Sequence, residues 1–221
     1  MNTHDNERIE RPKSLTEMVI ERLQTAIMEG DLKLGQALSE TMLATKFGVS
    51  KTPVREALFR LKQEGVVDII PQKGSFVFLP DPHQVNDLCE FRAYIEPLGL
   101  AEAFQEGGLD FLDDLEVCVT KMRRLLQRDD LVGYLRMDTQ FHQTFFDYCA
   151  NPYLKASYAL ISTKAAALRS HMSMNKSKAD MSNLQHIEIL ELLNDGKIEE
   201  AIALLKRHIV DIKKDFLVTV S

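Results

Sequence analysis

Gly48-Val-Ser-Lys-Thr-Pro-Val-Arg-Glu-Ala-Leu-Phe-Arg-Leu-Lys62 is the stretch that decides the fold of the N-terminal part of the chain. Gly48 suits a tight turn, and Ser50 or Thr52 offers an oxygen for the N-cap of a helix. Pro53 fits the first helical turn, where its missing N–H costs nothing. The stretch therefore predicts a turn that leads directly into a helix.

The predicted helix is amphipathic. Apolar residues recur at three- and four-residue steps and form the face expected to be buried: Val54, Ala57, Leu58 and Leu61. Lys51, Thr52, Arg55 and Arg60 lie away from this stripe. A helix with a polar, basic first turn that follows a tight turn is typical of the reading helix of a helix-turn-helix. A basic helix taken alone is more often a solvated face, so the flanking sequence has to distinguish the two interpretations.

Two further helices are predicted before this stretch. Ser14 and Glu17 form a capping box at the start of the first helix, which ends at Gly30. A loop follows, and Ser39 caps a second, short helix.

A β-hairpin is predicted after the basic helix. Residues 66–70 and 75–79 are rich in β-branched and aromatic side chains, and a turn with a glycine separates them. Three helices and a hairpin make a winged helix-turn-helix, which we place at residues 14–79 after a flexible N-terminal segment at 1–13.

The rest of the chain is predicted to be helical. Pro80 to His83 reads as a linker, and residues 84–221 carry helical periodicity interrupted by breakers such as Gly107-Gly108 and Asn151-Pro152. We expect helices at 84–106, 109–128, 130–149, 152–173, 182–195 and 197–218, with the polar stretch Asn175 to Asp180 as a break. The fold class is therefore mainly α, with an all-α bundle domain at residues 84–221 after the winged helix.

The charge of the chain is unevenly distributed. The net charge of the 221 residues is −6, yet residues 1–80 contain 11 Lys and Arg against 11 Asp and Glu. Within residues 46–73 the basic side chains outnumber the acidic ones. Because a DNA phosphate responds to the local charge, the acidic remainder does not exclude nucleic acid as a partner.

Composition places the chain among globular proteins of the cytoplasm. Apolar residues make up 45% and charged residues 27%, and no apolar run approaches the roughly 18–20 residues that span a bilayer. The three cysteines make no CxxC pair, and we expect reduced thiols. We expect no membrane association and no signal peptide.

Four polar residues occupy positions that helical periodicity assigns to the core. Asp138 and His142 fill two positions of an otherwise apolar stripe, while His186 and His208 lie among leucines and isoleucines of the last two helices. Imidazole and carboxylate groups brought together in this way can bind a divalent transition metal, with zinc or nickel as candidates. The alternative is structural: Asp138 pairs with His142, and the other two histidines are satisfied core residues.

The sequence resembles a known family. The run Gln36-Ala-Leu-Ser-Glu-Thr-Met-Leu-Ala-Thr-Lys-Phe-Gly-Val-Ser-Lys-Thr-Pro-Val-Arg-Glu-Ala-Leu-Phe-Arg-Leu61, with Gly65-Val-Val67 and Gly74-Ser-Phe-Val77, is similar to the winged helix of GntR-type bacterial transcription regulators. The helical part resembles the C-terminal FCD domain of the FadR-like branch. In that family Asp-x-x-x-His and two later histidines 22 residues apart mark the metal-binding subset, which agrees with the set described above.

The resemblance implies a role for residues at the start of the basic helix. Ser50, Lys51, Thr52 and Arg55 would contact double-stranded operator DNA, and Gly74 would let the wing approach the minor groove. Lys51 stands where the family usually has arginine, and lysine lacks the bidentate grip on guanine. Arg60 can contact DNA or pair with Glu56 four residues earlier. A single winged helix makes few contacts, so we expect a homodimer on a pseudo-palindromic operator.

The expected effector is a small carboxylate bound beside the metal. Arg92 can supply a charge partner for it, or can form a salt bridge with Glu96 or Glu90; Arg169 is a second candidate of the same kind. Three other functions compete with this one. They are a regulator that responds to acyl-CoA without metal, a dimerisation domain without effector, and a metal-dependent hydrolase, for which no catalytic motif is present.

Overall fold

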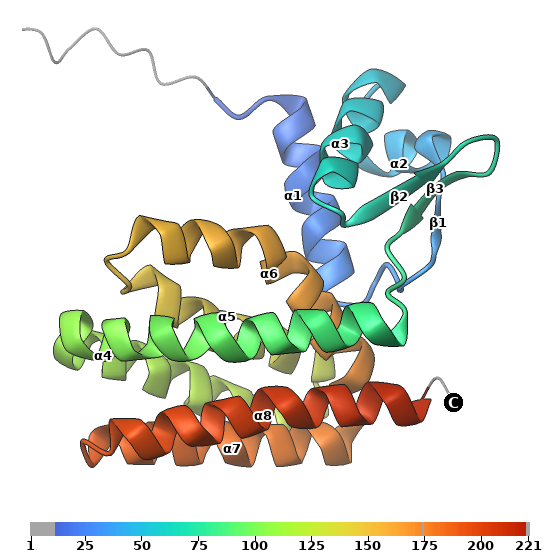
Figure 1. The fold of residues 1–221 in the computed structure, drawn as a ribbon. Coiled ribbons are helices and arrows are strands. Elements are labelled where there is room, and N and C mark those ends of the chain that lie inside the picture. Colours follow the sequence, from blue (N-terminus) through green and yellow to red (C-terminus); the bar gives the residue numbers. More distant parts are fainter. Residues whose placement is uncertain (1–11, 174, 220–221) are drawn as a thin grey trace, which may run out of the picture.

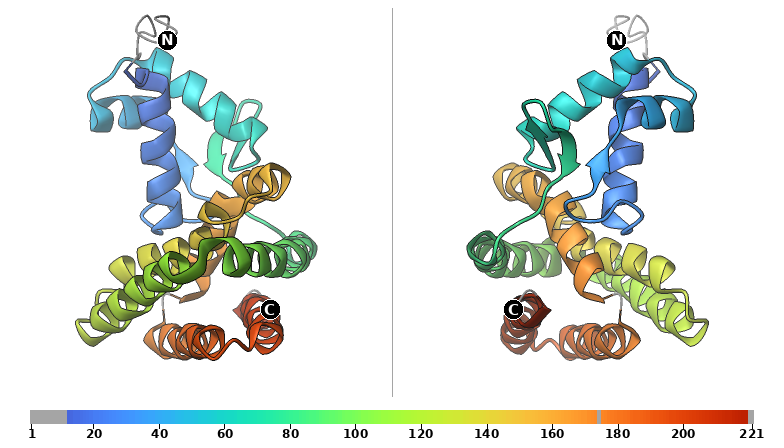
Figure 2. Two further views of the ribbon diagram at one scale, coloured as in Figure 1. Left: turned by 90° about the vertical axis from the view of Figure 1, so that its left-hand side faces the viewer. Right: turned by 90° about the vertical axis from the view of Figure 1, so that its right-hand side faces the viewer.

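The computed structural model describes residues 12–173 and 175–219 and places a small winged helix above a larger helical bundle (Figures 1 and 2). Its first part contains the helices α1 (Leu15–Met28), α2 (Glu40–Phe47) and α3 (Lys51–Gln63). The capping box predicted at the start of α1 is present, with Ser14 Oγ accepting from Glu17 N and the Glu17 carboxylate accepting from Ser14 N. The predicted turn before α3 is also present, because Gly48 adopts the left-handed conformation with φ of 67°. Ser50 occupies the N-cap position of α3, but its side chain makes no capping hydrogen bond.

The wing is a three-stranded antiparallel sheet in the order β1-β3-β2. The predicted hairpin is β2 (Val67–Ile70) and β3 (Gly74–Val77), paired in register from Val67 opposite Val77 to Ile70 opposite Gly74. The third strand, β1 (Ala37–Leu38), was predicted as loop; it pairs with β3. Two residues are too few to carry a pattern of alternation, so the strand depends on its partner rather than on its own sequence.

The bundle comprises five helices in the described part of the chain: α4 (Pro82–Gln127), α5 (Leu131–Asp147), α6 (Pro152–Ser173), α7 (Lys176–Asn194) and α8 (Ile198–Thr219). The predicted break at Gly107-Gly108 is found inside α4, where Gly108 leaves helical geometry with φ of 53° and ψ of −136°. The prediction that the polar stretch 175–180 is a break was wrong. Asn175 caps α7 by accepting from Ser177 N, so the polar residues are the solvated first turns of that helix.

The winged helix and the bundle each have their own hydrophobic core, and one residue of the bundle belongs to the core of the winged helix. The winged-helix core is built around Leu23, Val54, Leu61 and Val77, and the bundle core around the aromatic side chains of α4, α5 and α6. Ala167 of α6 belongs to the winged-helix core and is 2% exposed. Figure 2 shows α6, in gold and orange, reaching from the bundle to the winged helix. Helix α6 therefore serves both parts.

Among the helices that the structure describes, none combines the length and the apolar character needed to cross a bilayer.

Candidate metal centre and nucleic-acid interface

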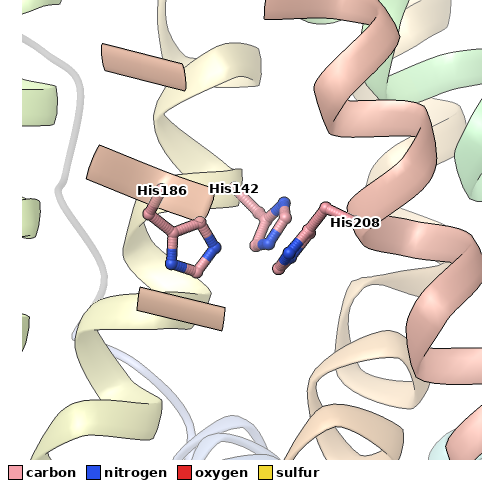
Figure 3. Close-up of side chains that lie close together, drawn as sticks. All are labelled: His142, His186 and His208. Carbon is pink, nitrogen blue, oxygen red and sulfur yellow. The ribbon is translucent and has the colours of Figure 1, made fainter. Parts of the chain in front are cut away.

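Three histidines from three helices converge in the middle of the bundle. His142 on α5, His186 on α7 and His208 on α8 have ring centroids 4.7 to 5.5 Å apart and are at most 1% exposed. One ring nitrogen of each lies within 4.8 Å of those of the other two. Figure 3 shows the three rings facing a common space. The prediction that these histidines come together from distant helices agrees with this arrangement.

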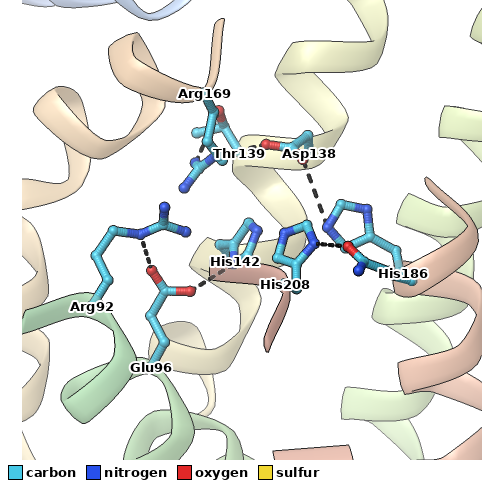
Figure 4. Close-up of polar contacts among 9 residues, drawn as sticks. Arg92, Glu96, Asp138, Thr139, His142, Arg169, His186 and His208 are labelled. Atoms are coloured by element: carbon cyan, nitrogen blue, oxygen red, sulfur yellow. Dashed lines mark hydrogen bonds and ion pairs between the residues drawn. The ribbon is translucent and has the colours of Figure 1, made fainter. Parts of the chain in front are cut away.

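Hydrogen bonds orient two of the three rings. His142 Nδ1 lies 2.7 Å from Glu96 Oε2, and His208 Nδ1 lies 2.7 Å from Gln185 Oε1 (Figure 4). A carboxylate and an amide oxygen can only accept, so each Nδ1 carries the proton and each Nε2 presents a lone pair. Neither Nε2, nor either ring nitrogen of His186, has a hydrogen-bond partner among the described residues. His142 and His208 thus each have one ring nitrogen bound to an acceptor and the other buried without a partner, which is how histidines that bind a metal are usually held.

Asp138 lies at the edge of this cluster. Its Oδ1 is 3.6 Å from His186 Nε2, and its Oδ2 is 2.7 Å from Arg169 Nε in a close ion contact that lacks hydrogen-bond geometry. The structural alternative, in which Asp138 pairs with His142, is not what the structure contains, because Glu96 is the partner of His142. Asp138 therefore remains a predicted fourth ligand, and its carboxylate is paired with Arg169.

The two arginines predicted to bind an effector lie beside the histidines, and both have ion-pair partners. Arg92 Nε is 2.6 Å from Glu96 Oε1, with both side chains fully buried, so the predicted alternative of a salt bridge to Glu96 is present. The two terminal nitrogens of Arg92 and Nη1 of Arg169 have no hydrogen-bond partner in the described part of the chain. The Tyr158 hydroxyl beside Arg169 is likewise buried and has no acceptor for its own proton in the described part of the chain. These are hydrogen-bond donors facing the interior without an acceptor.

Burial sets the protonation states of the cluster. It lowers the pKa of all three histidines, to about 3 for His186 and well below the usual value for His208, so the rings are neutral at pH 7. Burial alone would raise the pKa of Glu96, but the Arg92 charge and then His142 bring it below its usual range. The same balance lowers the pKa of Asp138, with Arg169 as the main opposing charge. Neutral imidazoles and an ionised carboxylate are the protonation states that metal ligation requires.

The metal-free protein is expected to lose stability as the pH falls from 6.5 toward 5. Because each histidine has a lower pKa folded than unfolded, the unfolded state binds more protons below about pH 6.5. The loss is about 1.4 kcal/mol per pH unit for each histidine that titrates only after unfolding. Urea unfolding in chelator at pH 7, 6 and 5 measures this. The lowered pKa values of Glu96 and Asp138 also reduce stability as the pH falls, but only below about pH 4.5. The effect of the histidines is therefore measured in a separate pH range. A free energy of unfolding that stays level between pH 7 and 5 would contradict the prediction.

The predicted DNA-contacting side chains on and before α3 are exposed. Ser50, Lys51, Thr52, Arg55 and Arg60 are all exposed on α3 or at its cap. The Nε of Arg55 lies 2.6 Å from Glu40 Oε2, which holds the guanidinium across the turn.

The other two candidates, Arg60 and Gly74, lie further along the chain. Glu56, the alternative partner of Arg60, accepts a hydrogen bond from Thr16 Oγ1 at 2.7 Å. Gly74 has φ of 108°, and a Cβ added to it would meet nothing within 4 Å. The wing tip is therefore open, as an approach to a groove requires.

Sequence reasoning missed two residues that hydrogen-bond to the histidine cluster. Glu96 was considered only as a partner of Arg92, whereas it also fixes the ring of His142 from another helix. Gln185 was not considered, although it directly precedes His186. The spacing of Arg92 and Glu96 by four residues was a usable signal for their own pair. The bonds to His142 and His208 depend on helix packing, which periodicity does not specify.

Comparisons with known proteins agree in both parts of the chain. Residues 15–77 match the family of bacterial regulatory proteins, gntR family, and residues 87–211 match the FCD domain. An uncharacterized HTH-type transcriptional regulator in an unstable DNA locus of Streptomyces ambofaciens is 31% identical over 202 residues, which are 85% of this chain and 79% of the relative. The Nta operon transcriptional regulator of Aminobacter aminovorans is 30% identical over 79% of this chain and 81% of its own length.

A solved structure supports the same fold. E. coli McbR/YncC superposes with a TM-score of 0.83 over 94% of this chain and 100% of its own, at 20% identity. The winged helix, the helical bundle and these relatives define a bacterial transcription regulator that binds DNA, and not an enzyme. The chain belongs to the GntR family and carries an FCD domain.

Proposed function

We propose that this regulator binds operator DNA as a homodimer and that a small carboxylate, bound beside a divalent metal in the bundle, controls its affinity. The proposal rests on the buried ring nitrogens of His142, His186 and His208 that have no hydrogen-bond partner among the described residues and lie close together. A fully buried imidazole nitrogen without a partner is costly unless something binds it. When bound, a metal such as zinc or nickel would supply an electrophilic centre for a carboxylate oxygen.

The side chains around the histidines fit this role. Glu96 and Gln185 keep the Nδ1 protons of His142 and His208, so that each Nε2 lone pair is available. Asp138 would complete the donor set through Oδ1, the oxygen nearer His186. Arg169 neutralises Asp138 and keeps the carboxylate ionised.

A carboxylate effector would meet donors that are otherwise unused. The terminal nitrogens of Arg92, Nη1 of Arg169 and the Tyr158 hydroxyl are buried without acceptors. Burial, with the Glu96 charge, raises the pKa of Tyr158 to about 12 against the lowering effect of the Arg169 and Arg92 charges, so the hydroxyl stays protonated and can donate. Charge-assisted hydrogen bonds from such groups are the usual means of holding a carboxylate away from water. Acyl-CoA binding without metal would leave the histidine cluster without a purpose.

Two contacts connect this site to the winged helix. Arg136, two residues before Asp138, forms a bidentate ion pair with Glu29 at the end of α1. Ala167, two residues before Arg169, is buried in the winged-helix core. A shift of α5 against α6 on effector binding would therefore displace α1 and the reading helix that packs on it. A coupling of ~1–3 kcal/mol would change operator occupancy about 5- to 150-fold.

The effector half of the proposal is tested by a thermal-shift screen of sugar acids, hydroxy acids and dicarboxylates on metal-loaded protein. Each hit is then titrated against operator DNA by fluorescence anisotropy, with metal-stripped protein as the control. We expect at least one acid that stabilises only the metal-loaded form and changes operator affinity. Acids that act equally on both forms would separate the effector from the metal and count against the proposal.

If the protein binds operator DNA as proposed, Arg55→Ala should weaken operator binding by about 1–3 kcal/mol, or about 5- to 150-fold in Kd. Arg55 is exposed beside the turn and is held by Glu40 in the free protein. Gel-shift titrations at several salt concentrations measure the affinity and the number of phosphate contacts. The matched control is Lys197→Ala, which removes an exposed positive charge from the far end of the bundle, where Lys197 pairs with Asp195. Equal affinities and salt slopes for the two variants would remove Arg55 from the interface.

A further inference from the structure

The second half of α4, after Gly108, has an exposed face that packs against nothing in the described chain. Its opposite face, which includes Leu115, Cys118, Val119 and Met122, is buried in the bundle. The exposed face surrounds a shallow hollow of about 420 Å³. Six side chains line the hollow: Asp113, Glu116, Val117, Thr120, Lys121 and Arg124. Successive members of this set are alternately three and one residues apart, so they form a single stripe along the helix.

The two ends of the stripe carry opposite charges. Its first two members are acidic and its last two are basic, with Val117 and Thr120 between them. Each member has a counterpart at the same distance from the midpoint between residues 118 and 119: Asp113 with Arg124, Glu116 with Lys121, and Val117 with Thr120. Rotation of the helix by 180° about an axis through that midpoint therefore places every acidic position opposite a basic one. This is the property that a two-fold symmetric contact between identical surfaces requires.

The charges of the stripe are not compensated along their own helix. Three and four positions from Asp113 lie Leu109, Asp110, Glu116 and Val117, and from Arg124 lie Thr120, Lys121, Gln127 and Arg128, so neither has a residue of opposite charge there. Like charges thus adjoin each other at each end, where alternating charges would have stabilised an isolated helix. The helix dipole favours acids at the start and bases at the end, but its effect falls off within one turn of each end. Glu116 and Lys121 lie beyond that range.

We propose that this face of α4 binds the same face of a second copy of the chain, with the two helices antiparallel. Asp113 would pair with Arg124 of the partner, Glu116 with Lys121, and each pair would occur twice. Val117, which is 47% exposed, would lie against the partner's Thr120 at the centre. The contact specifies which surface makes the homodimer of the proposed function and rests on that dimer.

Two charge-reversed chains test the pairing. The first carries Asp113→Arg with Glu116→Lys, and the second carries Lys121→Glu with Arg124→Asp. Either chain alone would oppose like charges at all four pairs, and we expect its dimer Kd to rise by about 100-fold or more. In a 1:1 mixture every pair is again of opposite charge. We expect the mixture to form a heterodimer with a Kd within about tenfold of the unmodified dimer.

Sedimentation velocity on each chain and on the mixture measures association, and circular dichroism establishes that each chain is folded. The control is Glu188→Lys with Glu191→Lys, an equal reversal on the exposed side of α7, which should leave the dimer unchanged. Recovery of a dimer only in the mixture would establish the pairing, since no general effect on folding restores it. Unmodified protein that dimerises as tightly as both variants would overturn this interface and leave the dimer intact. Unmodified protein that stays monomeric on operator DNA would overturn the dimer itself.

Discussion

Replacement of Glu96 by alanine is expected to lower the free energy of unfolding of the metal-free protein by about 3–5 kcal/mol. Glu96 is fully buried and accepts from both Arg92 Nε at 2.6 Å and His142 Nδ1 at 2.7 Å. Its removal leaves the Arg92 charge in the bundle without a counter-ion. Breaking a buried ion pair at one partner is costly for that reason, whereas removing both partners is tolerated far better. Urea unfolding followed by circular dichroism in chelator gives the difference.

Two further variants show whether the charge or the contact matters. Arg92→Met with Glu96→Leu removes both charges and fills the same space, so we expect it to regain more than half of the lost stability. Glu90→Ala, on an exposed turn of the same helix, removes a hydrogen bond from Tyr94 and should cost less than about 1 kcal/mol. If the double variant were as unstable as Glu96→Ala, an uncompensated Arg92 charge would not be the cause.

The second large effect is expected from metal. Zinc or nickel added to chelator-stripped protein should bind at one equivalent per chain and raise the melting temperature by about 10 °C. That shift corresponds to about 4 kcal/mol, the stabilisation at a free metal concentration near 1,000 times Kd. The reason is that His142, His186 and His208 present open nitrogens within 4.8 Å of one another when folded and are dispersed when unfolded. Differential scanning calorimetry with and without metal provides the measurement.

His186→Ala separates this site from adventitious binding. His186 has no hydrogen-bond partner on either ring nitrogen among the described residues, so its removal breaks no internal contact of that kind. We expect the variant to lose most of the metal-dependent shift. His83→Ala is the matched control, because His83 is exposed and pairs only with the exposed Asp87 in the described chain. Tag-free protein that takes up no metal, or a shift that survives in His186→Ala, would exclude the centre.

Most of the secondary structure could be predicted because the chain marks its element ends chemically. The Ser14 capping box, the left-handed Gly48 and the irregular Gly108 are each encoded by one or two residues. The errors occurred where the structure depends on a partner. Strand β1 exists through pairing with β3, and the first turns of α7 are polar because they face solvent. Local sequence does not contain either relationship.

The three histidines that cluster in the bundle could be picked out from the sequence, but the contacts that support them could not. A histidine on an apolar helical stripe, as at 142, 186 and 208, conflicts with its surroundings and therefore stands out in a sequence. Glu96 and Gln185 do not stand out, because a glutamate or glutamine on a helix is ordinary. Their roles arise only when α4 is packed against α5 and α7 against α8. The same holds for Arg169, whose ion contact with Asp138 joins α6 to α5.

The position of Ala167 in the winged-helix core limits how far regulators of this architecture are interchangeable. In a hybrid regulator joined within residues 80–83, the DNA-binding part would come from one protein and the bundle from another. The residues of α6 that pack against the DNA-binding part would then not come with it. Its packing boundary includes Ala167 and Ser170, whose Oγ would lie 3.1 Å from a Cβ at Gly30. A larger side chain supplied at 167 by another bundle would overpack the grafted core. Biosensors assembled from such parts should therefore carry the small residues of α6 together with the winged helix that they support.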